Sequence, residues 1–160
     1  MSLPSLSLAG KVALVTGARR GIGAAIAIRF AEAGGDVAVS DLVVNTGELA
    51  EVKKQIENLG RRSIAIQVDV SKKNEVDQMV QQVVQDFSAI DILVNNAGVG
   101  QGSTPTEPAQ FEEMMQQSAE RATRFQHNSM IEILAKEDWE KTLAINVGGC
   151  YLCSQSAARF

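Results

Sequence analysis

The chain has few of the residue types that metal, redox and disulfide sites require. Among 160 residues it has one histidine, His127, and two cysteines, in the segment Cys150-x-x-Cys153. Two cysteines make no disulfide framework, and with one distant histidine they fall short of the four ligands of a structural zinc site. We therefore expect no metal site, and we interpret both cysteines as small residues packed within a helix.

Long apolar runs and an excess of basic residues are also missing. No stretch approaches the roughly 20 apolar residues of a membrane span, and the N-terminus MSLPSLSLAG lacks the basic region of a signal peptide. The 15 basic and 19 acidic residues are mixed along the chain, without the basic stripe that attracts nucleic acid or an anionic membrane. These absences predict a soluble, cytoplasmic protein with no nucleic-acid or membrane partner.

The sequence does contain a repeated alternation of strand and helix patterns. Short apolar segments at 11–16, 36–40, 63–68 and 90–94 are separated by three segments with helical periodicity. The third helix shows the clearest period, and Ser71 is its expected N-cap. A further helix is expected over 139–160. Alternation of this kind predicts an α/β fold with a doubly wound parallel sheet of Rossmann type.

Polar or glycine-rich residues follow every predicted strand. They are Thr16-Gly-Ala-Arg-Arg-Gly-Ile-Gly23, then Asp41, Asp69-Val70 and Asn95-Asn96-Ala97-Gly98. The carboxyl ends of parallel strands meet at one edge of a sheet, where such folds bind their ligands. The glycine turn, G-x-x-x-G-x-G, can bring backbone N–H groups and a helix N-terminus close to a phosphate. It is not a Walker A loop, because no Gly-Lys-Ser/Thr follows. A tight turn without a ligand explains the glycines alone, but the four strand ends together favour a dinucleotide site.

These linked motifs resemble the classical short-chain dehydrogenase/reductase family. Thr16-Gly17-x-x-x-Gly21-Ile22-Gly23 is similar to the family's cofactor turn, Asp69-Val70 to its adenine contact, and Asn95-Asn96-Ala97-Gly98 to its N-N-A-G segment. Asn146 aligns with the family's helix-borne catalytic asparagine. The resemblance covers the chain apart from about 101–135. It implies an NAD(P)-binding domain over 1–160 that transfers hydride between a nicotinamide cofactor and a small alcohol or carbonyl substrate. It also implies a homo-oligomer, a dimer or tetramer formed through the helix that carries Asn146.

The resemblance further implies which residues contact the cofactor: Thr16, Gly17, Arg20, Gly21, Ile22, Gly23, Asp41, Leu42, Asp69, Val70, Asn95, Ala97 and Gly98. A carboxylate at Asp41 can accept hydrogen bonds from the adenosine ribose and would repel a 2′-phosphate. We therefore expect NAD, with NADP as the less favoured cofactor. Arg20 lies where some NADP-using relatives carry a base, although a solvated turn residue is an equally good interpretation.

The family's other catalytic residues do not occur in this sequence. A serine and a Tyr-x-x-x-Lys should follow Asn146, but the only tyrosine, Tyr151, is followed four positions later by Gln155, so we expect Tyr151 to pack. We accordingly expect the incomplete, cofactor-binding part of a larger enzyme, with about four strands of the family sheet and no activity alone. In the family's order 3-2-1-4 the fourth strand would then have an open apolar edge. The alternative is a non-catalytic NAD-binding half-domain or an inactive truncation product.

Residues 101–135 are predicted to be an insertion or loop within this domain. The segment begins with QGSTPTEP and continues with a weakly amphipathic stretch. An insertion at the carboxyl edge of the sheet can act as a lid or substrate loop. A disordered or oligomer-facing excursion is the alternative. His127 lies in this segment and is not expected to contact substrate.

Overall fold

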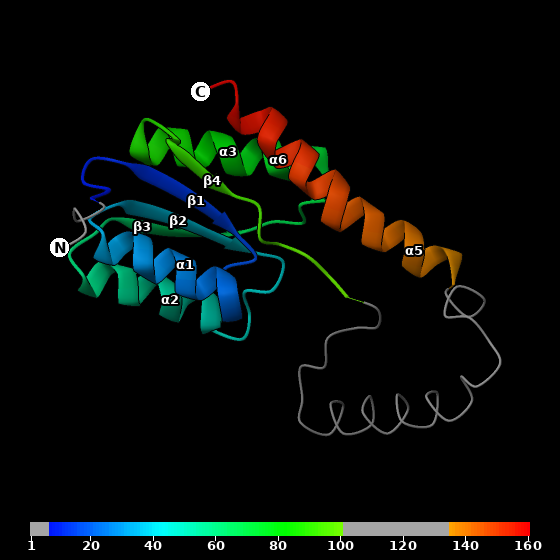
Figure 1. The fold of residues 1–160 in the computed structure, drawn as a ribbon, viewed down its shortest axis with the longest axis horizontal. Coiled ribbons are helices and arrows are strands. Elements are labelled where there is room, and N and C mark those ends of the chain that lie inside the picture. Colours follow the sequence, from blue (N-terminus) through cyan, green and yellow to red (C-terminus); the bar gives the residue numbers. More distant parts are fainter. Residues whose placement is uncertain (1–6, 101–134) are drawn as a thin grey trace, which may run out of the picture.

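The computed structural model describes residues 7–100 and 135–160 (Figure 1). The predicted insertion at 101–135, with His127, lies outside the described residues except at its last position. The predictions made for that segment therefore remain predictions.

A parallel four-stranded sheet forms the centre of the molecule. Its strands are β1 (Val12–Thr16), β2 (Asp36–Asp41), β3 (Ser63–Gln67) and β4 (Ile92–Val94), in the order β3-β2-β1-β4. Helices α1 (Gly21–Glu32) and α2 (Glu48–Asn58) cover one side, and α3 (Lys73–Phe87) covers the other (Figure 1). This arrangement confirms the predicted Rossmann-type fold. The strand bounds differ from the prediction by one or two residues, most at β4, which begins at Ile92 rather than at residue 90.

The central strands are apolar because helices cover both of their faces. All five residues of β1 are buried, and its four apolar residues alternate between two cores. Ala13 and Val15 pack with residues of α1 and α2, whereas Val12 and Leu14 pack with residues of α3. The continuous apolar run in the sequence is thus the expected pattern of a parallel strand buried on both faces.

The last helical segment departs from the single regular helix that the sequence predicts. It consists of α5 (Lys136–Leu143), a π-helical stretch η2 (Ala144–Gly149) and α6 (Cys150–Ala157). Figure 1 shows them as one continuous rod, of which α6 lies beside α3. The rod therefore begins earlier than predicted and ends before Phe160.

Within α6, one packing prediction is confirmed and another is wrong. Cys153 is buried in the α3-side core, and that burial raises the pKa of its thiol to about 11, as expected of an inert packed cysteine. Cys150 is half-buried. Tyr151, in contrast, is 62% exposed, and its hydroxyl accepts a hydrogen bond from the Gln155 side chain at 2.7 Å. It does not pack in the described structure.

Ser71 does not cap α3 as predicted. The helix begins at Lys73 with Lys72 at the N-cap and no capping side chain. The hydroxyl of Ser71 instead donates to Asp69 Oδ1 at 2.6 Å. The serine therefore shapes the loop after β3 rather than the helix end.

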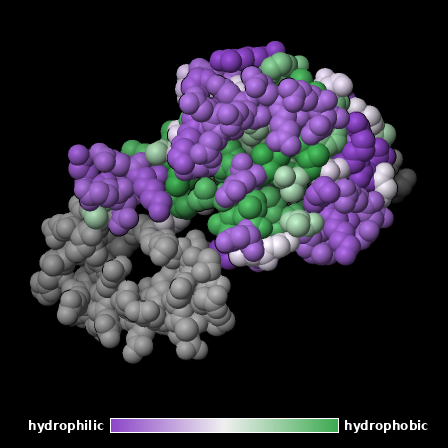
Figure 2. Space-filling model, turned by 180° about the vertical axis from the view of Figure 1, so that it is seen from behind, coloured by the Kyte–Doolittle hydropathy of each residue, from purple (hydrophilic) through white to green (hydrophobic). Residues whose placement is uncertain are grey.

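Apolar surface remains exposed on two parts of the described structure. The three residues of β4 are only half-buried, and β4 pairs with β1 alone among the described strands. Large exposed apolar side chains also recur along the rod, at Trp139, Leu143, Val147 and Tyr151. On the face seen in Figure 2, apolar residues gather in a band across the middle, with hydrophilic residues above and below. Among the described helices, none is both long and apolar enough to cross a membrane.

A buried carboxylate joins the amino ends of β2 and β3. Asp36 accepts hydrogen bonds from the Arg61 guanidinium, from the backbone N–H of Arg62 at 2.9 Å and from Arg62 Nε at 2.8 Å. Burial opposes ionisation of Asp36, but the hydrogen bonds from Arg62 and Arg61 outweigh it and hold the pKa of the carboxyl below its usual value.

This ion pair predicts a pH-dependent contribution to stability. A depressed pKa stabilises the fold fully above the unfolded-state pKa near 4, and this contribution is lost as pH falls through the lower folded-state pKa. Replacing Asp36 by Asn should lower the free energy of unfolding by about 2 kcal/mol at pH 7. The difference from wild type should shrink below about pH 4. Urea titrations at pH 7 and pH 3 measure it, with exposed Glu57→Gln as a control expected to change stability by less than about 0.5 kcal/mol. An equal cost of Asp36→Asn at both pH values would contradict the assignment.

Candidate functional site

The glycine turn after β1 is packed against the segment that follows β4. Gly17 has φ +63°, and a Cβ there would lie 2.7 Å from Ala97 Cα. A Cβ on Gly23 would lie 2.3 Å from the carbonyl oxygen of Gly17. Both positions therefore require glycine for close backbone approach, and Gly17 requires it for its left-handed conformation as well.

Hydrogen bonds from Thr16 and Asn96 hold these two segments together. The buried hydroxyl of Thr16 accepts from the backbone N–H groups of Asn96 and Ala97, both at 3.1 Å. The side-chain amide of Asn96 donates in return to the carbonyl oxygens of Thr16 and Gly17, at 3.0 and 2.8 Å. Asn96 was not among the predicted contact residues. Its place inside the quoted N-N-A-G segment is the one feature of the sequence that could have indicated its role.

The N-terminus of α1 opens toward solvent. Arg20 stands at the N-cap in extended conformation without capping through its side chain, and the first turn contains no acidic residue. A Cβ on Gly21 would meet nothing within 4 Å, and Ile22 is 74% exposed. Uncapped N–H groups and the positive end of the helix dipole are suited to an anion such as a pyrophosphate.

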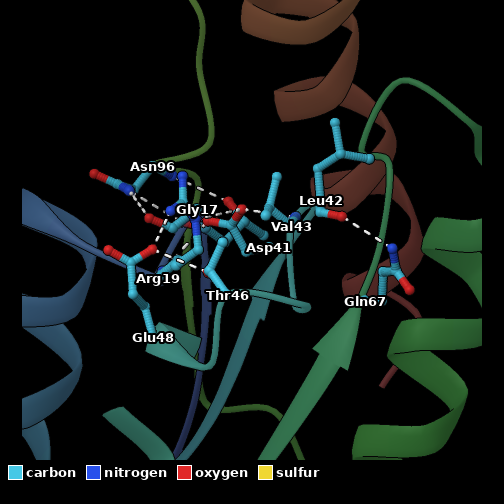
Figure 3. Close-up of polar contacts among 10 residues, drawn as sticks. Gly17, Arg19, Asp41, Leu42, Val43, Thr46, Glu48, Gln67 and Asn96 are labelled. Carbon is cyan, nitrogen blue, oxygen red and sulfur yellow. Dashed lines mark hydrogen bonds and ion pairs between the residues drawn. The ribbon is translucent and has the colours of Figure 1, made fainter. Parts of the chain in front are cut away.

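Asp41 and Leu42 lie at the carboxyl end of β2, beside the glycine turn (Figure 3). Asp41 accepts hydrogen bonds from the backbone N–H groups of Arg19, at 3.3 Å, and Val43, at 3.1 Å. These contacts fix the carboxylate at the end of the strand. Leu42 is 55% exposed, and its carbonyl oxygen accepts from the Gln67 side chain at 3.0 Å.

The end of β3 presents Asp69 and Val70. Partial burial disfavours the charged form of Asp69, but hydrogen bonds from the backbone N–H and hydroxyl of Ser71 and the ammonium of Lys72 outweigh it and lower the pKa of the carboxyl. Asp69 is therefore ionised at neutral pH. Val70 is buried against the π-helical stretch, where a Cβ on Gly149 would lie 2.7 Å from Val70 Cγ2.

The fourth strand end is joined to the helical rod by two asparagines. Asn95 Nδ2 donates to the hydroxyl of Ser154 at 3.0 Å. The side-chain amide of Asn146 makes two hydrogen bonds to the backbone of Val99. Its Oδ1 accepts from the Val99 N–H at 2.8 Å, and its Nδ2 donates to the Val99 carbonyl oxygen at 2.9 Å. Gly98 lies next to this contact. Asn146, predicted to be catalytic, thus lies at the same sheet edge as the predicted cofactor residues.

A pocket of about 430 Å³ lies between β3 and α3. It shares Leu42 with the predicted site, but none of the glycines of the turn lines it. Within the described ranges, no three histidine, cysteine, aspartate or glutamate side chains are grouped as metal ligands would be.

The chain is similar in sequence to many dehydrogenases and reductases. The family model described as short chain dehydrogenase matches residues 11–133. A short-chain dehydrogenase/reductase of Armillaria gallica is 35% identical over 150 residues, which are 94% of this chain and 48% of that protein. A 3-oxoacyl-[acyl-carrier-protein] reductase of Synechocystis is 33% identical over 153 residues, 96% of this chain and 51% of the relative. The chain thus spans about half the length of these curated relatives.

Solved structures give the same result. A short chain dehydrogenase from Burkholderia cenocepacia in complex with NADP has a TM-score of 0.72 and 39% identity, covering 95% of this chain and 51% of the other. A short-chain type dehydrogenase/reductase from Mycobacterium marinum has a TM-score of 0.74 and 30% identity, covering 96% and 51%.

The close approach at Gly23 generates a prediction about the site. Gly23→Ala should destabilise the chain by about 2 kcal/mol or more. The new Cβ would clash with the carbonyl oxygen of Gly17, a backbone atom that cannot move away as a flexible side chain could. Gly148→Ala is the matched control. Its Cβ would come no closer than 3.7 Å to any atom outside the local helix backbone, and alanine favours helix, so stability should be equal or higher. Urea denaturation measures both, and equal effects of the two substitutions would contradict the close packing of the turn.

Proposed function

The chain belongs to the short-chain dehydrogenase/reductase family, and from that premise we propose that it forms the NAD(P)-binding part of an oxidoreductase. The proposal covers residues 1–160 as one incomplete domain with an insertion at 101–135. The whole enzyme would transfer a hydride between NAD(H) and a small alcohol or carbonyl substrate. The observation that carries the proposal is the convergence of four strand ends at one edge, where the glycine turn is clamped against the N-N-A-G segment by Asn96.

Each strand end has a part in holding the cofactor. The uncapped N-terminus of α1 would bind the pyrophosphate through Gly21, Ile22 and Gly23. Asp41 would accept hydrogen bonds from the adenosine ribose, and Asp69 with Val70 and Leu42 would lie along the adenine. Thr16, Gly17, Asn95, Ala97 and Gly98 would form the floor beneath the rest of the dinucleotide. When bound, the cofactor supplies the hydride donor or acceptor.

The proposed preference for NAD depends on Asp41. A carboxylate at the end of β2 repels a 2′-phosphate, and Arg20, the alternative phosphate contact, is exposed at the N-cap of α1. The solved relatives include complexes with NADP and NADPH. These relatives support a nicotinamide cofactor without favouring NAD.

Catalysis is proposed for the whole enzyme and not for this chain alone. Asn146 would position groups at the reacting end of the cofactor, since its amide already fixes the backbone of Val99. No Tyr-x-x-x-Lys occurs in the sequence to supply a proton. We also propose a cytoplasmic location and self-association of the enzyme, for which the exposed apolar residues along the rod provide a surface.

A non-catalytic NAD-binding module is the second candidate function. Such a module would bind the dinucleotide at the same sheet edge and carry out no chemistry. A longer reading frame with a Tyr-x-x-x-Lys helix after Asn146 would support the enzyme, and a stop codon directly after Phe160 would support the module.

Nucleotide binding tests both candidates. The chain should bind NADH with a dissociation constant below about 1 mM, read from enhanced nicotinamide fluorescence or from quenching of its single tryptophan. Reduced nicotinamide mononucleotide, which lacks the adenosine half, should bind at least about tenfold more weakly because Asp41, Asp69 and Val70 then have no partner. Absence of NADH binding by a folded chain would refute the proposed function.

The role of Asp41 has its own test. Asp41→Asn removes the charge and keeps one of the two oxygens that accept from the backbone N–H groups of Arg19 and Val43. It should lower the ratio of the NADPH to the NADH dissociation constant by about tenfold. Asp41→Ala should change the ratio in the same direction, and exposed Glu57→Gln should leave it unchanged. An unchanged ratio in both Asp41 variants would show that this carboxylate does not select the cofactor.

A further inference from the structure

Arg19 is the buried cation of the predicted cofactor edge. Its side chain is only 8% exposed, although it lies in the glycine turn beside the exposed Arg20. Its Nε lies 3.6 Å from Asp41 Oδ1, and its Nη1 donates to the carboxylate of Glu48, at the start of α2. Figure 3 shows Arg19 between these acidic groups, with Thr46 also donating to Glu48. The sequence gives no sign of this role for Arg19, because a second arginine in a turn has no distinguishing pattern.

One polar atom of this cluster is left without a partner. Arg19 Nε is buried and makes no hydrogen bond within the described residues, since 3.6 Å from Asp41 is too long for one. The guanidinium is therefore held mainly by charge and by Glu48. Arg19 also holds the pKa of the Glu48 carboxyl below its usual value through their hydrogen bond, so that Glu48 is ionised at neutral pH.

Two positive and two negative side chains gather around the end of β2 and the turn. Arg19 and Arg20 balance Asp41 and Glu48, so the local net charge is close to zero. Without Arg19 the balance would be negative. The field at the ribose position therefore depends on the buried arginine as well as on Asp41.

We propose that Arg19 is a specificity-determining residue: as the counter-charge of Asp41 and Glu48, it limits how strongly this edge excludes a 2′-phosphorylated dinucleotide. Arg19 acts from beneath Asp41 and needs no contact with the phosphate itself. Asp41 still favours the unphosphorylated ribose, but Arg19 offsets much of the negative field that would repel a 2′-phosphate. This inference rests on the proposed function, because it requires the adenosine ribose to lie at Asp41.

Dissociation constants for NADH and NADPH, measured on the full chain, test the inference. Arg19→Met removes the charge and keeps an unbranched side chain, and it should raise the ratio of the NADPH to the NADH constant by about tenfold. Arg19→Lys should keep the ratio within about threefold of wild type. Glu48→Gln removes one negative charge and should lower the ratio. Arg29→Met, on the exposed side of α1, is the matched control and should leave it unchanged.

The ratio separates charge from structure, because a general loss of folding weakens both nucleotides alike. The effect of Arg19→Met should also shrink between about 0.05 and 0.5 M salt, as screening reduces the field. Equal ratios for the Arg19→Met and Arg29→Met variants would overturn the inference. It would also be overturned if Glu48→Gln and Arg19→Met changed the ratio of the two dissociation constants in the same direction. If Arg19→Met does not fold, Glu48→Gln decides: a lowered ratio supports the inference and an unchanged one overturns it. Failure of wild type to bind either nucleotide would instead overturn the proposed function and the inference together.

Discussion

The candidate site depends on the reciprocal hydrogen bonds between Thr16 and Asn96. They join the end of β1 to the segment after β4, two parts of the chain that are distant in sequence but adjacent in the sheet. Because the Asn96 amide also holds the carbonyl of Gly17, it fixes the turn at a separation that only glycine permits. The geometry of the proposed phosphate site at α1 thus depends on an asparagine in the segment after β4 as well as on the glycines.

Charge at the neighbouring strand ends is balanced locally. Asp41 has Arg19 beside it, and Asp69 has Lys72 and the hydrogen bonds of Ser71. A carboxylate with a nearby cation creates a weaker negative field than an unpaired one. This arrangement would suit an acidic edge to the phosphate-carrying ligand that we propose for it. Selectivity among such ligands then follows from small differences in the position and number of charges.

The π-helical stretch connects the two ends of the proposed dinucleotide site. Gly149 allows the rod to pack directly against Val70, at the end of the proposed site that would hold the adenine. Asn146, in the same stretch, hydrogen-bonds the backbone of Val99 after β4. Irregular helical turns of this type often occur at functional positions. Asn95 adds a further link through Ser154. The rod therefore holds the strand ends in place, in addition to carrying Asn146.

The sequence by itself determined most of the elements, the sheet class and the positions of the motifs that follow each strand. The spacing of apolar residues and the glycine turns are local properties of the sequence, so β1, β2 and α3 could be located within one or two residues. Motifs such as Thr16–Gly23 mark strand ends directly. Only the tertiary structure decided the partners. Contacts between distant segments place Arg19 beside Asp41 and Asn95 beside Ser154, and they leave Tyr151 exposed. The Ser71 hydroxyl hydrogen-bonds Asp69 instead of capping α3, which is a competition for one hydrogen bond. Local pattern carries no information about such contacts, because each is selected by the packing of the whole chain.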